Sequence, residues 1–184
     1  IGKELGQPLI VGDAQALLGA IEFFRRNLDD ARTHYEQALH TATEAGISRS
    51  RVHTQLALAR LALYHKDFAT CKSQAAAAQT LAVEIGEKAA VDMARAMLAA
   101  VEACVGLFNM GLRQLQETLQ KVEQTDQPEE LMQLTIITGQ VLMEHGQNDE
   151  DREEGRRMLQ DALANAQFHH FAPEIKLIEE TLDN

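Results

Sequence analysis

The sequence predicts an all-α fold, a solenoid built from antiparallel helix pairs. Small residues recur in steps of 40 along the chain. They form two series: Gly19, Ala59, Ala99 and Gly139, and Gly6, Gly46, Gly86 and Asp126. A fixed period of this size is typical of stacked helical repeats, because each unit buries its apolar face against its neighbours. Composition agrees, since aromatic residues make up only 4% of the 184 residues and three prolines leave room for long helices.

Charge and cysteine usage argue against several classes of function. The formal net charge of −11 disfavours binding to nucleic-acid backbones and anionic membranes, which both favour basic surfaces. Cys71 and Cys104 do not form a C-x-x-C pair, so we expect buried thiols and a cytoplasmic protein. The chain shows no secretory signal, lipidation motif or long apolar run. It starts at Ile1 rather than Met, which indicates a fragment or a processed chain.

Repeat one spans about residues 11–46 and contains helix A, a short turn and helix B. Asn27 is the expected N-cap of helix B, and acids in the first turn favour its dipole. Helix B then carries small and aromatic residues on one face, at Ala31, Tyr35, Ala38 and Leu39. Gly46 stands where a left-handed residue closes the helix.

Repeats two, three and four span about residues 47–86, 87–126 and 127–170. In repeat two, Asp67 is the expected N-cap of helix B. The face of helix B recurs there as Cys71, Ala75 and Ala78. In repeat four the register slips, because Gly155 follows Gly146 four residues later than the period requires. Residues 147–151 therefore predict a longer, acidic turn between helices A and B.

The two ends predict partial units, which brings the expected number of helices to nine. Residues 1–6 are interpreted as the last turn of a preceding helix, closed by Gly6. After His169-His170, Pro173 opens a short helix over residues 173–183. This helix either caps the last pair or is helix A of a continuing array.

Several of these residues resemble the tetratricopeptide repeat signature. They are Leu18-Gly19 in helix A, Asn27-Leu28 in the turn, and Ala31, Tyr35 and Ala38-Leu39 in helix B. The resemblance implies a single domain over residues 1–184, folded as a right-handed superhelix. The period of 40 exceeds the usual ~34 and is similar to the long-helix repeats in sensor regions of large bacterial transcriptional activators. A HEAT-like array, whose period suits 40, is the alternative fold.

The same resemblance implies that the helix A residues line a concave, partner-binding groove. The residues expected to bind a partner are Phe24, His53, Arg60, Tyr64, Met93, Met97, Gln133 and Gln140. A lining of Met and aromatic residues adapts to a peptide helix or an apolar segment. The alternative is that these side chains only pack helix A against its neighbours. Ala16, Ala20, Leu56 and Arg60 replace the first members of the clamp that grips chaperone tails, so that binding mode is not expected.

No motif predicts catalysis, a cofactor or a metal site. G-x-S-x-G, H-E-x-x-H and P-loop patterns are absent from the sequence. The acidic stretch 149–154 lacks the ligand spacing of an EF-hand, so we expect solvated acids that open helix B. His169 and His170 are adjacent and do not share a helix face, and no third ligand is evident.

Three hypotheses about function remain. The first is a non-catalytic scaffold that binds a protein or peptide segment on the concave helix A surface. The second is an effector-sensing or regulatory segment of a larger bacterial signalling protein or transcriptional regulator, in contact with other domains of its chain. The third is a homo-oligomer formed through an exposed solenoid end, near Ile10, Leu17 and Ala31.

Overall fold

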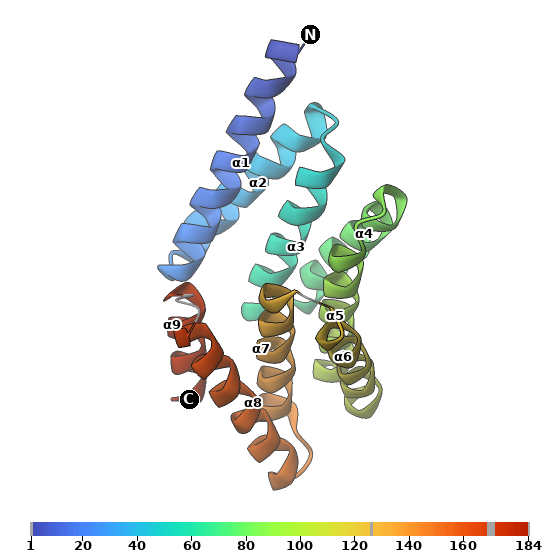
Figure 1. Cartoon of the computed structure of the whole chain (residues 1–184), viewed down its shortest axis with the longest axis vertical. Coiled ribbons are helices and arrows are strands. Elements are labelled where there is room, and N and C mark those ends of the chain that lie inside the picture. Colours follow the sequence, from blue (N-terminus) through green and yellow to red (C-terminus); the bar gives the residue numbers. More distant parts are fainter. Residues whose placement is uncertain (1, 126, 169–171, 184) are drawn as a thin grey trace. The chain divides into compact units, whose positions relative to one another are not determined.

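The computed structural model describes residues 2–125, 127–168 and 172–183. Over these residues the chain forms nine α-helices and no strand, and consecutive helices pack against their neighbours in a repeat-like arrangement (Figure 1). The all-α prediction is therefore confirmed. The chain divides into two compact units, Ile1–Ala94 and Arg95–Asn184, which are described separately below.

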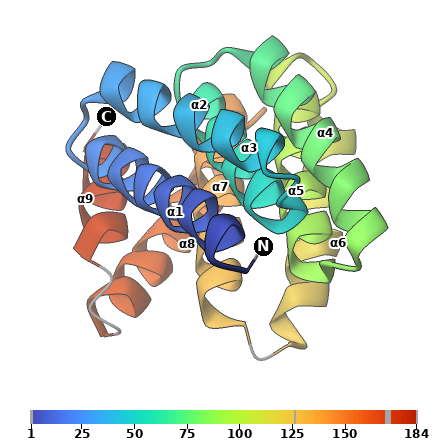
Figure 2. The ribbon, with the colours of Figure 1, turned by 90° about the horizontal axis from the view of Figure 1, so that it is seen from above.

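Unit 1 contains four complete helices and the start of a fifth. These are α1 (Gly2–Phe24), α2 (Leu28–Glu44), α3 (Ser48–Tyr64), α4 (Phe68–Ile85) and the first part of α5 (Lys88–Cys104). Helices α1 and α2 lie side by side in both views of the ribbon (Figures 1 and 2). Helix α3 packs on both α4 and α2.

Unit 2 contains the rest of α5 and four further helices. These are α6 (Phe108–Glu123), α7 (Pro128–His145), α8 (Asp149–Phe168) and α9 (Ala172–Leu182). Helix α7 packs on α6 and α8, and α9 packs on α8. The core of this unit joins α7, α8 and α9 through buried residues such as Ile136, Leu159 and Ile178.

The period of 40 is visible in the helix starts. Helices α2, α4 and α6 begin at residues 28, 68 and 108, and α3, α5 and α7 begin at 48, 88 and 128. The turns repeat as well, because Arg26, Lys66 and Gly106 all adopt a positive φ, of 66°, 59° and 105°. Gly46, with a φ of 67°, takes the left-handed conformation expected after helix B.

The register slip in repeat four is confirmed by burial. The buried face of α2 consists of Ala31, Tyr35, Ala38 and Ala42, and that of α4 lies 40 residues on at Cys71, Ala75, Ala78 and Ala82. In α8 the same face is Gly155, Leu159, Ala162 and Ala166. Gly155 follows the buried Gly111 of α6 by 44 residues, so four extra residues precede it.

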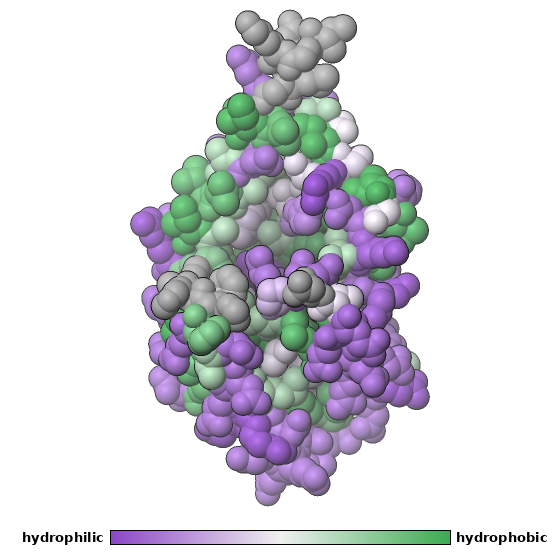
Figure 3. Space-filling view, viewed as in Figure 1, coloured by the Kyte–Doolittle hydropathy of each residue, from purple (hydrophilic) through white to green (hydrophobic). Residues whose placement is uncertain are grey.

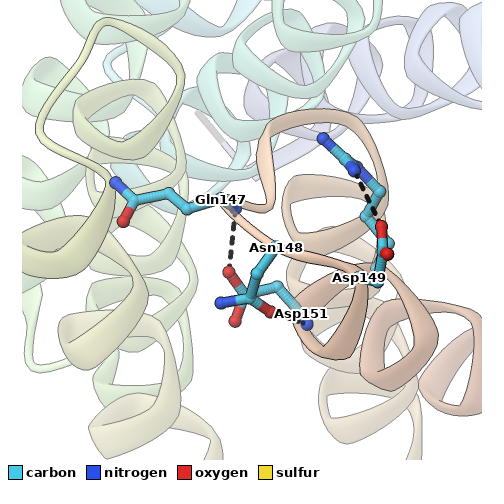
Figure 4. Close-up of polar contacts among 5 residues, drawn as sticks. Gln147, Asn148, Asp149 and Asp151 are labelled. Atoms are coloured by element: carbon cyan, nitrogen blue, oxygen red, sulfur yellow. Dashed lines mark hydrogen bonds and ion pairs between the residues drawn. The ribbon is translucent and has the colours of Figure 1, made fainter.

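The prediction of a longer turn between α7 and α8, which was based on the register slip, is wrong. Three residues, 146–148, join α7 to α8, as three residues, 25–27, join α1 to α2, and the acids instead open a helix of 20 residues. The side-chain Oδ1 of Asn148 accepts a hydrogen bond from the Asp151 N–H at 2.8 Å. Asp151 Oδ2 in turn accepts one from the Gln147 N–H at 2.8 Å (Figure 4). This reciprocal cap and the favourable helix dipole start the helix early.

Two expected N-caps have different outcomes. Asp67 caps α4 as predicted, since its Oδ1 accepts a hydrogen bond from the Thr70 N–H at 3.1 Å. Asn27 occupies the N-cap position of α2 but makes no side-chain cap. Its Nδ2 donates instead to Glu22 Oε2 at 2.6 Å. That hydrogen bond holds the pKa of the Glu22 carboxyl below its usual value.

The ends differ from the expectation. Helix α1 runs without interruption through Gly6 and Pro8, so the predicted helix end at Gly6 is wrong. The glycines with a positive φ are Gly46, Gly86 and Gly106 among the described residues, and without such a residue nothing closes the helix at Gly6. Helix α9 begins 44 residues after α7 and so takes the helix A position of a further repeat. Asp126, His169 and His170 lie outside the described residues.

The predicted apolar end face is only partly correct. Ile10 and Leu17 of α1 are exposed, at 69% and 66%, but Ala31 is fully buried. Ala31 belongs to the small-residue face of α2 in the core of unit 1, where close helix packing excludes solvent. Of the two thiols expected to be buried, Cys71 is buried and Cys104 is half-buried.

Candidate functional site

One face of α3 brings three of the predicted partner-binding residues together. His53, Ala57, Arg60 and Tyr64 follow one another at helical spacing, so they form a single line of side chains, the α3 stripe. His53 is exposed, Ala57 and Arg60 are half-buried, and Tyr64 is 39% exposed. The stripe therefore offers accessible side chains along most of α3.

Arg60 lies over aromatic rings from α1. The central carbon of its guanidinium is 5.0 Å from the centroid of the Phe23 ring and 5.7 Å from that of Phe24. Both distances are within the range of a cation–π interaction. Phe23 is 1% exposed and Phe24 is half-buried, and their rings meet edge to face at 5.5 Å. Arg60 thus covers the C-terminal end of α1.

Tyr64 extends this arrangement by one more ring and one more cation. Its ring meets the edge of Phe23 at 5.9 Å, and the guanidinium of Arg26 lies 4.7 Å from its centroid. Arg26 comes from the turn after α1, where its positive φ of 66° directs the chain into α2. We call Phe23, Phe24, Arg26, Tyr35, Arg60 and Tyr64 the aromatic–guanidinium cluster.

Tyr35 of α2 interacts electrostatically with Arg60. Burial raises the pKa of Tyr35 above its usual value, and the nearby positive charge of the Arg60 guanidinium counteracts part of this rise. No carboxylate forms an ion pair with Arg60 in the part of the chain that the structure describes. The cluster therefore holds a cation whose charge is offset only by rings and a hydroxyl.

The predicted residues of α5 and α7 do not form a comparable surface. Met93 and Met97 are 6% and 1% exposed, so the expectation that they face a groove is corrected. They belong to the core because α5 is buried on several sides at small residues, which let neighbouring helices approach closely. Gln133 is half-buried, and Gln140 donates through Nε2 to Thr181 Oγ1 of α9 at 3.2 Å. At Met93, Met97 and Gln140 the observed contacts therefore fit the alternative in which helix A packs against its neighbours better than they fit an open groove.

A groove that was not predicted lies on a different face of α3 from the α3 stripe. This groove of about 400 Å³ runs between α2 and α4 with α3 as its floor. The floor is apolar and the rim is polar: Leu39, Leu58, Leu61 and Ala62 lie below Arg32, Glu36, His40, Thr43, Thr70 and Gln74. The only sequence signal for it is that α3 carries apolar residues on more than one side, which also fits plain burial.

The described residues contain no group of three or more His, Cys, Asp or Glu side chains that could hold a metal ion. In the same ranges of the chain, no helix combines the length and the apolar character needed to cross a membrane. The side chains that unit 1 gathers around the α3 stripe are aromatic rings, guanidinium groups and the imidazole of His53. Comparison with known proteins adds no relative, since neither a protein-family model nor a curated protein sequence matches this chain.

Proposed function

We propose that the chain is a non-catalytic scaffold of the tetratricopeptide-like class that binds a protein or peptide segment along the α3 stripe. The observation that carries this proposal is Arg60, a half-buried guanidinium on two rings with no carboxylate partner among the described residues. The resemblance of Leu18-Gly19 and Ala31-x3-Tyr35 to the repeat signature supports the class. The period of the helix starts is consistent with it.

The partner is expected to carry an acidic group beside an apolar side chain. Arginine keeps its charge at all physiological pH values, and its planar fork can bind a carboxylate with two hydrogen bonds. The Arg60 guanidinium lies over the Phe23 and Phe24 rings, and its N–H groups can donate to such a ligand. The half-buried Phe24 and the partly exposed Tyr64 supply apolar contact on either side.

Because the net charge is −11, the affinity for an acidic segment has to come from the residues in direct contact with it. The acidic protein as a whole repels an acidic segment, so binding has to come from Arg60 and its immediate surroundings. His53 and Arg60 are seven residues apart on one helix face, or about 10 Å. A segment of about three extended residues covers that distance. The site therefore suits a short motif rather than a long acidic tail.

The direct experiment is selection from a random peptide display library with the intact chain as bait. Enriched peptides should carry Asp or Glu next to an aromatic or aliphatic residue. Arg60→Gln should weaken the binding of an enriched peptide at least about tenfold, because a charge-assisted hydrogen bond is lost. Arg60→Lys should recover only part of the affinity, because it restores the charge but not the planar fork.

Arg113→Gln in α6 is the matched control. Arg113 is an exposed arginine whose contact is an ion pair with Glu117 on the same helix, and its removal should leave peptide affinity unchanged. The proposal fails if no peptide is enriched, or if enriched peptides bind the Arg60→Gln protein as tightly as the parent. Equal weakening by both substitutions would indicate non-specific charge attraction and would also contradict it.

A second candidate function rests on the groove between α2 and α4. Its volume of about 400 Å³ falls within the range of small-molecule sites. This supports the alternative of an effector-sensing segment within a larger bacterial regulator. Thermal-shift screening of the chain against small metabolites tests it. A metabolite that raises the melting temperature of the parent chain should not raise that of Gln74→Trp, in which the larger side chain occupies part of the groove. It should still raise that of Arg60→Gln.

A further inference from the structure

The groove between α2 and α4 has one wall that carries two opposite charges. Helix α3, the floor of the groove, lies between α2 and α4 in both views of the ribbon (Figures 1 and 2). Arg32 and Glu36 line the groove from α2, and both side chains are exposed. Neither forms an ion pair or a side-chain hydrogen bond within the part of the chain that the structure describes. The wall therefore presents a cation and an anion that can each bind a group of opposite charge.

The two charges do not satisfy each other. Arg32 and Glu36 are one helical turn apart, so their Cβ atoms are separated by about 5–6 Å. Arginine before glutamate is the less favourable order for an ion pair along a helix, because it opposes the helix dipole. The charge of Arg32 also acts on Asp67, the N-cap of α4, but the described residues show no ion pair between them. One small molecule with a carboxylate and an ammonium group can bind Arg32 and Glu36 at the same time.

The repeat register indicates that the packing of the helices does not require this pair. The buried Ala31 of α2 recurs forty residues on as the buried Cys71 of α4, because both helices need a small residue at that crossing. Glu36, by contrast, is followed forty residues on by Ala76. The pair of opposite charges thus belongs to this wall of the groove and not to the repeat.

The register also places an unsatisfied amide beside the opposite wall. In repeat one, Gln15 Oε1 and His34 Nδ1 form a hydrogen bond of 2.7 Å between α1 and α2. The same positions in repeat two are Gln55 of α3 and Gln74 of α4, and Gln74 lines the groove. Gln55 is 9% exposed, and its Oε1 accepts no hydrogen bond from any described residue. A buried acceptor of this kind costs free energy until a donor reaches it, and an ammonium group offers three donors.

The size and the floor of the groove restrict the ligand to a small molecule with a short apolar part. Leu39 is half-buried, and Leu58 is 6% exposed, so the accessible apolar surface is narrow. Helix α1 differs, because its exposed apolar side chains gather in the open below the grey atoms of its first turns (Figure 3). The volume of about 400 Å³ lies near the lower end of the range for small-molecule sites.

We propose that this groove binds a free α-amino acid with an aliphatic side chain. The carboxylate binds the guanidinium of Arg32 with two hydrogen bonds, and the ammonium group binds Glu36. The aliphatic side chain lies on Leu39 and Leu58. The two charged groups of an α-amino acid are attached to one carbon atom, which suits two side chains one helical turn apart. This inference rests on the second candidate function, an effector site in the groove, and names the class of the effector.

NMR titration of the intact chain with L-valine, L-leucine and L-isoleucine tests the site. Amidation of the tightest of the three removes its carboxylate charge, and N-acetylation removes its ammonium charge. Each modified form should bind the parent chain at least about tenfold more weakly. Arg32→Gln should weaken the amino acid by a similar factor and leave the affinity of the amide unchanged. Glu36→Gln should weaken the amino acid and leave the affinity of the N-acetyl form unchanged.

Lys72→Gln is the matched control and should leave all affinities unchanged. Lys72 is exposed and has the register of Arg32 on α4, but it does not belong to the lining of the groove. The proposal is overturned if none of the three amino acids binds at millimolar concentration, or if both groove variants bind the tightest one as well as the parent does. A different metabolite whose effect is lost in Gln74→Trp would overturn the amino-acid assignment and leave the second candidate function standing. If no small molecule binds, both fail.

Discussion

The ring of Tyr35 lies directly against the backbone of Gly19, where α1 crosses α2. A Cβ atom added at Gly19 would stand 2.7 Å from two carbons of that ring. Gly139 and Leu159 make the equivalent contact in unit 2, with 2.9 Å between an added Cβ and Leu159 Cγ. Gly19 and Gly139 thus mark helix crossings at which a glycine faces a large side chain. At Ala99, in the same series, the close neighbour is instead Gly111 of α6, where an added Cβ would stand 2.3 Å from the Ala99 carbonyl oxygen.

Gly19→Ala should destabilise the chain, although alanine is the better helix former. The propensity gain of about 1 kcal/mol is outweighed by overpacking against the Tyr35 ring, so we expect a net loss of about 1–2 kcal/mol. Gly12→Ala is the control on the same helix. Its Cβ would meet Thr41 Cγ2 at 3.7 Å, an ordinary contact, so it should gain about 0.5–1 kcal/mol. Urea unfolding measures both, and a gain in both variants would contradict the crossing.

Tyr35→Phe should separate the titration of the hydroxyl from the packing of the ring. Because the variant keeps the ring, the free energy of unfolding should change by less than about 1 kcal/mol near neutral pH. Burial raises the pKa of the folded Tyr35, so the folded chain holds this proton at a pH where the unfolded chain has lost it. Stability should therefore fall as the pH rises above 10, the usual tyrosine value, and Tyr35→Phe should remove this part of the decline. Unfolding at pH 8 and above pH 10 tests it.

The period of the sequence predicted the start of most helices because small residues at a crossing leave a clear compositional mark. The same logic located the slip at Gly155. It failed at the turn before α8, since polar residues such as Gln147 and Asn148 suit a loop as well as a cap. Whether they cap depends on the backbone hydrogen bonds they find, and Asn148 finds the N–H of Asp151.

The candidate site was predictable only in unit 1. Phe24 and Tyr64 occupy matching positions 40 residues apart on neighbouring A helices, and Arg60 lies one turn before Tyr64, so the repeat register places the three together. Phe23 and Tyr35 complete the cluster but carry the pattern of ordinary core residues. Met97 had the same register as Ala57, and its burial depends on which helices cover α5. A single sequence reports side-chain type and spacing, and it does not report what packs on each face.

Asp67→Asn should make the stability of unit 1 less sensitive to acid. The hydrogen bonds from Thr70 hold the pKa of the Asp67 carboxyl below its model-peptide value of 3.8. Such a carboxylate stabilises the fold above that value, and the stabilisation is lost as the pH falls through the lower, folded pKa. Asparagine also caps helices but does not titrate. The difference in unfolding free energy between parent and variant should therefore shrink between pH 7 and pH 2. A difference that stays constant with pH would exclude the role of this cap.

Asn148→Ala should destabilise unit 2 and shorten α8 from its N-terminal end. The variant loses the hydrogen bond that Asn148 Oδ1 accepts from Asp151, and an N-cap of this type is worth about 1 kcal/mol. The reciprocal bond from the Gln147 N–H to Asp151 depends on the same turn, so the first acids of α8 should fray. Asn165→Ala, an exposed position within α8, is the control and should be neutral or slightly stabilising. Hydrogen exchange at residues 151–154 measures the fraying directly: faster exchange in Asn148→Ala alone is expected, and unchanged exchange would mean that the acids start the helix without the cap.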